Sequence, residues 1–426
     1  MIKIILDNPN KREDIFSAVE AKVDVSATVR DIISEVISRG DEALYEYAIK
    51  FDKVSLDSLR VSQEEIDEAL SEVDEEFIDI LRRAKDNIYE YHSLQKRQGI
   101  QLSRADGVRL GQVVLPIERV GIYVPGGTAA YPSTVLMDSI PAIVAGCDRI
   151  VMVTPPSRDG KVNPVILVAA HIAGVKEIYK VGGAQAIAAL AYGTESIPKV
   201  DKIVGPGNAY VAEAKRQVYG KVSIDMIAGP SEIMVIADAK SNAKWVAADL
   251  LSQAEHDRLA SAVLVTDSEQ FAKEVSMEID RQIPLLTRSE IARASIDDYG
   301  KIIVTSDISS AIDIANGIAP EHLEICLDNA RDYLPRIKHA GSVFLGRYCP
   351  EALGDYYAGT NHTLPTSGTA RFSSPLSVDD FIKKTQYIEY DRDALERVYE
   401  DIDYFAKQEG LTAHARSVSV RFEKDE

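Results

Sequence analysis

Cysteine, tryptophan and histidine are all scarce in this chain of 426 residues, which holds 3 Cys, 1 Trp and 7 His. Cys147, Cys326 and Cys349 are too few and too scattered for a disulfide framework or a CxxC metal knuckle. This usage is typical of a protein of the reducing cytoplasm, which is the localisation we expect. Cys147 and Cys326 resemble buried small hydrophobic residues at element junctions, so we assign neither the role of a catalytic nucleophile.

Other features are also missing. No apolar run is long enough to cross a bilayer, and residues 1–7 lack the apolar region and cleavage site of a signal peptide. Basic residues number 48 against 67 acidic ones, for a net charge of −19, and this excess repels the phosphates of nucleic acids. We therefore expect no membrane segment, no export signal and no nucleic-acid partner.

The composition is that of a globular protein, with 46% hydrophobic and 27% charged residues. The length allows about two or three domains. In residues 23–51 and 62–94, apolar side chains recur at the three-and-four spacing of amphipathic helices. We expect residues 1–118 to form a helical N-terminal region that packs on the second of two α/β domains.

From residue 119 onward, short β-branched runs alternate with helical segments, which indicates parallel βαβ units of Rossmann-like type. We expect α/β domains at 119–231 and 232–376, followed by a helical arm at 377–426 that closes with a short β-prone segment, 417–422. In the first domain, the expected strands are 120–124, 149–154, 177–181 and 202–204, and the expected helices are 134–146, 165–173, 184–192 and 208–219. In the second domain, the expected strands are 232–236, 262–266, 302–304 and 342–345.

Three glycine-rich turns in the first domain each follow an expected strand and open a helix. In open α/β sheets, ligands bind at the carboxyl ends of strands, where helix N-termini favour phosphate. A dinucleotide could therefore lie across these turns, although none matches GxGxxG and glycine also serves simply to make such turns. The turns are Pro125-Gly126-Gly127, Gly182-Gly183-Ala184-Gln185 and Gly205-Pro206-Gly207-Asn208.

Four residues carry side chains of the types that zinc accepts. Gln253 and His256, three apart near a helix end, share one face, but such a pair is also common on a solvated helix end. Asp355 lies in a glycine-rich loop, where an Asx-type turn is the alternative, and His414 lies in the C-terminal arm, where the alternative is an exposed helix residue.

Glu321 and His322 follow Pro320 and present a carboxylate and an imidazole side by side. Imidazole can accept a proton near neutral pH, and an adjacent carboxylate can orient it or relay the proton. The alternative is a solvated Glu next to a packed His. We take His92, His171 and His339 as structural.

Several long motifs follow one another along nearly the whole chain. They are residues 120–127 (VGIYVPGG), 182–190 (GGAQAIAAL), 205–209 (GPGNA), 228–232 (AGPSE), 320–324 (PEHLE) and 409–415 (EGLTAHA), together with the Gln253/His256 pair. In sequence and in order, these motifs resemble those of the histidinol dehydrogenase family.

The resemblance implies zinc-dependent, four-electron oxidation of L-histidinol to L-histidine through histidinal, with two NAD⁺ reduced, as the last step of histidine biosynthesis. It implies one Zn²⁺ per subunit and Glu321 and His322 as the acid/base pair. The implied zinc ligands are Gln253, His256, Asp355 and His414. The implied NAD contacts are Tyr123, Gln185 and Asn208. The implied substrate contacts are Ser231, His322, His362, Glu409 and the four zinc ligands.

The resemblance further implies an intertwined homodimer, in which Glu409 and His414 of the C-terminal arm reach the partner's site. Two other functions remain open from the sequence. The chain could oxidise another polar alcohol, such as a sulfonated diol, or it could bind NAD or zinc without catalysis. The presence of Ser231 and Glu409 argues against the first function, and that of Glu321 and His322 against the second.

Overall fold

The computed structural model describes residues 2–8, 24–126 and 130–423. The chain divides into two units. The larger unit consists of Met1–Gln95 and Ile117–Phe381, and the smaller unit consists of Lys96–Pro116 and Ile382–Glu426. Within the described residues, no helix is long and apolar enough to cross a membrane.

The first sheet of the larger unit is parallel and five-stranded, in the order β6-β5-β4-β7-β8. The chain order reverses between β4 and β7, and the crevice at such a reversal is the usual ligand site of an open α/β sheet. The strands are β4 (Arg119–Tyr123), β5 (Arg149–Thr154), β6 (Glu177–Lys180), β7 (Lys202–Val204) and β8 (Ser223–Ile224). The helices that follow are α6 (Pro132–Ala145), α7 (Pro164–Ala173), α8 (Gly183–Tyr192) and α9 (Ala209–Val218).

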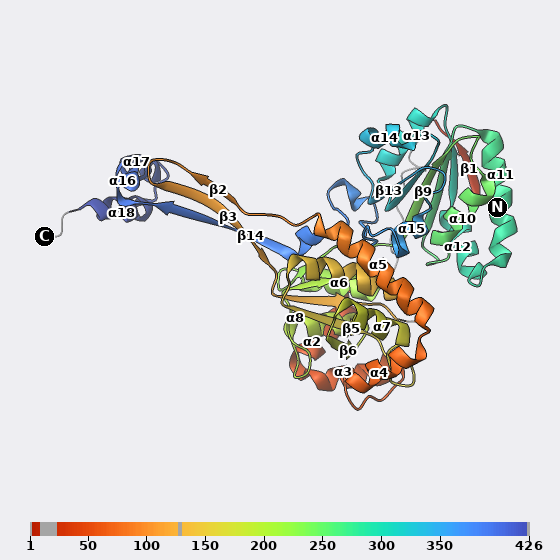
Figure 1. The fold of residues 1–426 in the computed structure, drawn as a ribbon, viewed down its shortest axis with the longest axis horizontal. Helices are drawn as coiled ribbons and strands as arrows, with labels where there is room; N and C mark the ends of the chain where they lie inside the picture. The colour runs from red at the N-terminus through yellow and green to blue at the C-terminus, as the bar shows by residue number, and fades with distance from the viewer. Residues whose placement is uncertain (1, 9–23, 127–129, 424–426) are drawn as a thin grey trace. The chain divides into compact units, whose positions relative to one another are not determined.

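The N-terminal helices pack against this first sheet and its helices (Figure 1). Val29 of α2 shares a core with Leu190 of α8, and Ile78 of α5 shares another with Leu167 of α7. The expectation that this region packs on the second α/β domain is therefore wrong for most of its helices, because an amphipathic pattern marks the apolar face of a helix without identifying the domain it packs on. Helix α5 also contacts the second domain, where Asn87 Nδ2 donates to the Tyr357 carbonyl at 2.8 Å. These elements are α2 (Ser26–Arg39), α3 (Asp41–Tyr47), the π-helix η1 (Ala48–Asp52), α4 (Gln63–Glu72) and α5 (Glu75–Ser93).

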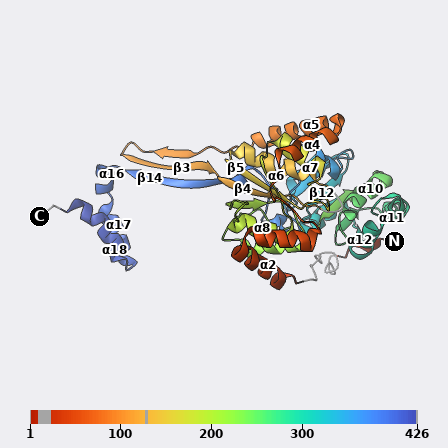
Figure 2. The same ribbon diagram turned by 90° about the horizontal axis from the view of Figure 1, so that it is seen from below.

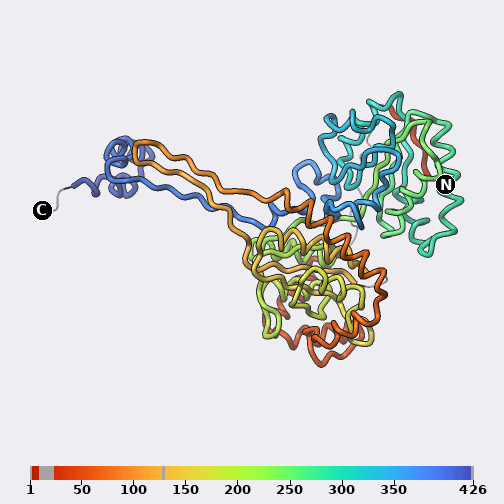
Figure 3. The backbone as a smooth tube through the Cα atoms, viewed as in Figure 1, coloured from red at the N-terminus to blue at the C-terminus, as the bar shows by residue number. Residues whose placement is uncertain are grey.

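The second sheet of the larger unit has six parallel strands in the order β1-β11-β10-β9-β12-β13. Its edge strand β1 (Lys3–Leu6) comes from the N-terminus, drawn red among the green and cyan segments of Figure 3. The other strands are β9 (Glu232–Ala237), β10 (Ser261–Thr266), β11 (Lys301–Val304), β12 (His322–Cys326) and β13 (Ser342–Leu345). The helices are α10 (Ala243–Ala254), α11 (Glu269–Gln282), α12 (Ser289–Tyr299), α13 (Ile308–Ile318), α14 (Ala330–Tyr333) and α15 (Glu351–Tyr356), and the 3-10 turns are η2 (Ile283–Leu285), η3 (Leu334–Arg336), η4 (Thr369–Arg371) and η5 (Val378–Phe381).

The strands expected in both α/β domains are confirmed to within a residue or two of their ends, as are the four expected helices. The short apolar runs succeed as predictors because both sheets are covered on their two faces by apolar cores, so that their strands read as continuous β-branched segments. Strand β12, whose first residue is His322, is a central strand of the second sheet that the sequence pattern did not identify.

The smaller unit is built on an antiparallel sheet in the order β14-β3-β2, and Figure 2 shows β14 running beside β3. Part of the N-terminal region expected to be helical is therefore strand, and so is the part of the expected helical arm that forms β14. The β-prone residues 417–422 are helical, because the Phe422 ring packs on Tyr399 with centroids 4.5 Å apart and tertiary contact overrides local propensity. The elements are β2 (Ile100–Ser103), β3 (Val108–Pro116), β14 (Ile382–Tyr390), α16 (Arg392–Glu396), α17 (Tyr399–Gln408), α18 (Thr412–Ser419) and η6 (Val420–Phe422).

A buried ion pair fixes the turn after β7. The side chains of Lys215 and Asp225 are 2% and 1% exposed and contact each other directly. Lys215 Nζ also donates to the Gly205 carbonyl at 2.9 Å, and Asp225 Oδ2 accepts from the Gly205 N–H at 2.9 Å. Because these groups satisfy one another, the pair holds the backbone of this turn in place.

Removing one charge of this pair should strongly destabilise the fold. We expect Asp225→Asn to lower the free energy of unfolding by about 3 kcal/mol, because it leaves a buried ammonium without its counter-ion. The control is Asp79→Asn, which breaks the half-exposed pair with Arg82 and should cost less than about 1 kcal/mol. Urea unfolding of the two variants measures both values, and equal losses would contradict the role given to Asp225.

Candidate active site

A cavity of about 830 Å³ opens at the carboxyl ends of the first sheet. Tyr123, Gln185 and Asn208, the three residues implied as NAD contacts, all line it. The Tyr123 hydroxyl accepts a hydrogen bond from the Gly183 N–H at 3.1 Å, and the Asn208 side chain caps α9. The volume lies within the range of about 300–1,000 Å³ typical of small-molecule and cofactor sites. Gly127, part of the first glycine-rich turn, lies outside the described residues.

His322 begins β12 with its imidazole buried at 3% exposure. Its Nδ1 lies 2.9 Å from the carbonyl oxygen of Glu232, at the start of the neighbouring strand β9. A carbonyl only accepts hydrogen bonds, so Nδ1 carries a proton. His322 Nε2 is buried and has no hydrogen-bond partner in the described residues, which leaves it available for chemistry.

Glu321 lies directly before β12 and is 7% exposed. Its Oε2 accepts from the Glu232 N–H at 2.8 Å and lies 3.6 Å from His322 Nδ1. Burial raises the pKa of Glu321 to about 7, although charged His322 opposes the shift. Burial likewise raises the pKa of Glu232 to about 7. Glu321 can therefore exchange a proton near neutral pH.

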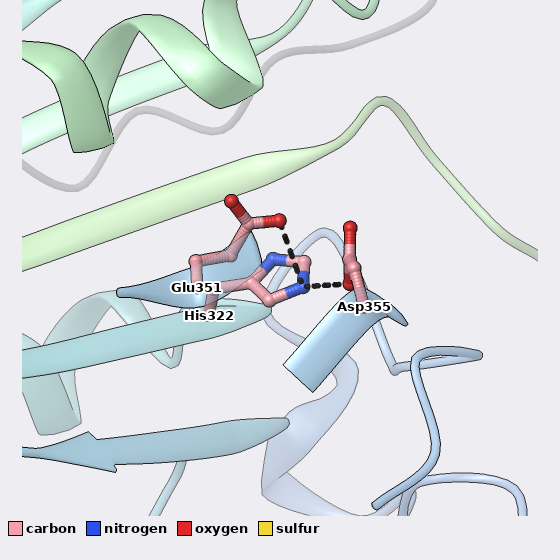
Figure 4. Close-up of side chains that lie close together, drawn as sticks. All are labelled: His322, Glu351 and Asp355. Atoms are coloured by element: carbon pink, nitrogen blue, oxygen red, sulfur yellow. Dashed lines mark ion pairs between the residues drawn. The ribbon is translucent and has the colours of Figure 1, made fainter. Parts of the chain in front are cut away.

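The carboxylates of Glu351 and Asp355 lie beside His322 Nε2, as Figure 4 shows. The distances are 4.0 Å to Glu351 Oε1 and 3.8 Å to Asp355 Oδ1, and the ligand-type atoms of the three residues all lie within 4.8 Å of one another. Asp355 was expected in a loop, but it lies on helix α15, four residues after Glu351. Because residues four apart share a helix face, both carboxylates point to the same site.

The side chain of Gln253, 1% exposed near the end of α10, joins this cluster. Its Nε2 donates to Glu351 Oε1 at 2.7 Å, and the Ser252 hydroxyl donates to Glu351 Oε2 at 2.8 Å. Both oxygens of Glu351 are thus engaged. Gln253 Oε1, in contrast, is buried and without a partner in the described residues, so it is free to bind a cation or a donor.

Of the remaining site residues of the larger unit, two histidines lie near Asp355, and Ser231 lies next to Glu232. His362 Nδ1 lies 3.9 Å from Asp355 Oδ1, and its Nε2 is 3.3 Å from the Thr134 hydroxyl of α6. His256 follows the end of α10; burial lowers the pKa of its imidazole, and nearby Asp355 raises it. Ser231 directly precedes Glu232 at the start of β9.

The cluster carries more negative charge than the described residues neutralise. Burial lowers the pKa of His322, but Glu321 and Asp355 together raise it to about 10. Burial and Asp355 raise the pKa of Glu351, whereas the two histidines hold the pKa of Asp355 well below its usual range despite burial. A divalent cation would offset this charge, so the donor set fits a metal ion.

Glu409 and His414 belong to the smaller unit. They flank the turn between α17 and α18, where Gly410 adopts a φ of 75°. Both line a cavity of about 440 Å³ together with Phe405 and Leu411. The structure therefore brings these two predicted residues next to each other in a unit separate from the other site residues.

Sequence reasoning missed two residues of the site, Glu232 and Glu351. Glu232 was present in a recognised motif, but only its neighbour Ser231 was assigned a role. The spacing of Glu351 and Asp355, four residues apart, could have indicated a shared helix face. The interpretation of the segment around Gly354 as a loop concealed it.

Comparisons with known proteins agree on one family. The family model described as "Histidinol dehydrogenase" matches residues 17–422. The chain is 55% identical to histidinol dehydrogenase of Clostridium acetobutylicum over 99% of both chains, and 55% identical to that of Bacillus cereus over 100% of this chain and 97% of the relative. A crystal structure of histidinol dehydrogenase from Elizabethkingia anophelis, 41% identical, matches with a TM-score of 0.93 over 99% of this chain and 98% of that one.

Metal binding should be visible as stabilisation of the fold. We expect Zn²⁺ to raise the melting temperature of chelator-treated protein, since a ligand at 100 times its Kd stabilises the folded state by about 2.7 kcal/mol. Asp355→Asn should reduce this rise at the same zinc concentration, and the control Asp267→Asn, at an exposed position, should leave it unchanged. An undiminished rise in the Asp355 variant would place the metal outside this cluster.

Proposed function

The chain belongs to the histidinol dehydrogenase family, and on that premise we propose how its residues carry out the reaction. Its function is the NAD-dependent oxidation of L-histidinol to L-histidine, the last step of histidine biosynthesis. Converting an alcohol to an acid removes four electrons, so two NAD⁺ each accept one hydride and histidinal is the intermediate. The observation that carries the assignment of roles is the buried Glu321–His322 pair beside Asp355 and Gln253.

We propose that the metal is zinc, held by Gln253, His256 and Asp355 together with His414. The unpartnered Gln253 Oε1 and the low pKa of the Asp355 carboxyl support the first and third of these ligands. When bound, zinc would orient the substrate as a template and offset the surrounding carboxylates.

Glu351 also lies within the cluster, but its contacts favour a positioning role. Its two oxygens accept hydrogen bonds from Gln253 Nε2 and the Ser252 hydroxyl. Because the Gln253 amide nitrogen donates to Glu351, the amide oxygen has to face the other way. Glu351 therefore sets the orientation in which Gln253 can act as an oxygen ligand.

His322 is proposed to accept the proton of the substrate alcohol as hydride leaves. The Glu232 carbonyl holds the proton on Nδ1, so in the neutral ring the lone pair resides on Nε2, the nitrogen that faces the cluster. The surrounding carboxylates raise the pKa of His322 to about 10 against the effect of burial. A cation that offsets their charge would lower this pKa and favour the neutral ring that accepts a proton.

Glu321 is proposed to activate water for attack on the aldehyde before the second hydride transfer. Its pKa, raised to about 7 by burial, suits a group that takes and returns a proton near neutral pH. Its hydrogen bond from the Glu232 N–H fixes the carboxylate beside His322. The two proton transfers thus fall to adjacent residues in one buried site.

The remaining roles follow the positions of the side chains. Tyr123, Gln185 and Asn208, which line the cavity of the first sheet, are proposed as NAD contacts. We propose Ser231, His362 and Glu409 as substrate contacts. NAD, when bound, supplies the hydride acceptor.

We also propose that the enzyme is a homodimer in which Glu409 and His414 complete the partner's site. Their location in a unit of its own, on a turn with its own cavity, supports this arrangement. It would also account for a zinc ligand placed so late in the chain.

The first experiment measures stoichiometry. With excess NAD⁺, we expect about two NADH per L-histidinol, lost after chelation and restored by Zn²⁺.

Glu321→Gln should lower the turnover by about 10²–10⁴-fold, the usual contribution of a general acid or base. The control Glu269→Gln, at an exposed position, should retain activity. Absence of NADH with every metal tested would overturn the substrate assignment.

Shared sites can be tested with mixed dimers. We expect Glu321→Gln and His414→Ala homodimers to be nearly inactive, because each lacks one component in both sites. Unfolding and refolding a mixture should restore up to about a quarter of wild-type activity, since half of the dimers are mixed and each of these has one intact site. Refolded wild type is the control, and no recovery in the mixture would show that both residues act within one subunit.

A further inference from the structure

The wall of the large cavity contains a carboxylate that none of the roles above uses. Asp52 ends the π-helix η1 and lines the cavity together with Tyr123 and Gln185. Within the described part of the chain, its carboxylate makes no hydrogen bond or ion pair. Burial raises the pKa of Asp52 to about 6. The carboxylate is therefore charged at pH 7 and above, but its partial removal from water makes the charged form less favourable than in an exposed Asp.

The backbone around Asp52 is unusual. Single π-helical turns are rare and often occur at functional sites. Lys53, which directly follows η1 and caps it, has a φ of 62°, in the left-handed region that a side chain disfavours. The chain therefore accepts a strained turn that places a carboxylate on the cavity wall.

The cavity lacks an acid where a dinucleotide fold usually supplies one. In such folds, an acidic residue near the end of the second strand binds the ribose hydroxyls of NAD, and an Arg there accommodates the 2′-phosphate of NADP. Here the second strand is β5, and the residues after it are Pro155, Pro156, Ser157 and Arg158, all of which line the cavity. Taken alone, Arg158 would favour NADP.

We propose that Asp52 determines the dinucleotide specificity of this cavity by accepting hydrogen bonds from the ribose hydroxyls of NAD⁺ and repelling the 2′-phosphate of NADP⁺. The proposal rests on the proposed function, in which NAD occupies this cavity. The N-terminal helical region thereby supplies the acid that is missing among the residues after β5 that line the cavity, since Asp159 of that loop is not part of the cavity wall. The negative charge of Asp52 also counteracts the attraction of Arg158 for a phosphate.

The test measures the Kd of NAD⁺ and of NADP⁺ for the full-length protein by titration calorimetry. Wild type should bind NAD⁺ more tightly. Asp52→Asn should weaken the binding of NAD⁺ and tighten that of NADP⁺. The ratio of the two Kd values should change by about tenfold or more, which corresponds to ~1.4 kcal/mol. Asp52→Asn combined with Arg158→Ala should lose the gain in NADP⁺ affinity, because the cation that attracts the phosphate is gone.

The matched control is Asp57→Asn, an exposed acid five positions further along the chain, which should keep the wild-type ratio. Melting temperatures of all variants verify folding, and Asp52→Glu should retain the preference for NAD⁺. If Asp52→Asn still binds NAD⁺ and keeps the wild-type ratio of the two Kd values, the role of Asp52 is wrong and the proposed function is unaffected. A wild-type protein that binds neither dinucleotide would overturn the proposed function along with it.

Discussion

The site depends on the cost of holding several carboxylates around one buried imidazole. Glu321, Glu351 and Asp355 all lie within 4.0 Å of a nitrogen of His322, where water is largely excluded. Burial penalises each charge, and the neighbouring acids repel one another, so the pKa values of Glu321 and Glu351 rise. Such a cluster is stable only with added positive charge, from protons or from a cation. The same electrostatics that make the site costly to form also prepare it to bind a metal ion.

Strand pairing is what brings Glu321 and His322 into register with Glu232. β12 lies between β9 and β13, and the parallel pairing aligns His322 with Ile233. This register places the Glu232 carbonyl on His322 Nδ1 and the Glu232 N–H on Glu321. One residue of β9 therefore orients both members of the pair through its backbone, so a shift of register would misplace both at once.

The sequence predicted most of the α/β framework, because strands buried on both faces read as apolar runs. Its predictions failed where tertiary contacts decide the outcome, as for the domain on which most of the N-terminal helices pack and for the helical state of residues 417–422. The site shows the same division. Residue types and motifs singled out Glu321, His322 and Asp355, which the structure brings together, whereas Glu351 was missed because its segment was interpreted as a loop. Convergence of side chains is a property of the packing, which motif spacing does not encode.

The contact between α6 and the segment 361–363 links the helices of the first sheet to the segment that follows the second sheet in the larger unit. Asn361 Nδ2 donates to the Met137 carbonyl at 2.6 Å, and the Thr363 hydroxyl donates to Asp138 at 2.8 Å. Burial raises the pKa of Asp138 to about 8, so this carboxyl can remain protonated and neutral within the interface. His362 lies between these two anchors, with its ring directed at Asp355 on one side and at Thr134 on the other. These anchors hold α6, which follows the first glycine-rich turn, to the segment that carries His362. In the proposed function, NAD lies in the cavity of the first sheet and the substrate lies beside His322, so hydride transfer would depend on these buried hydrogen bonds between the two places.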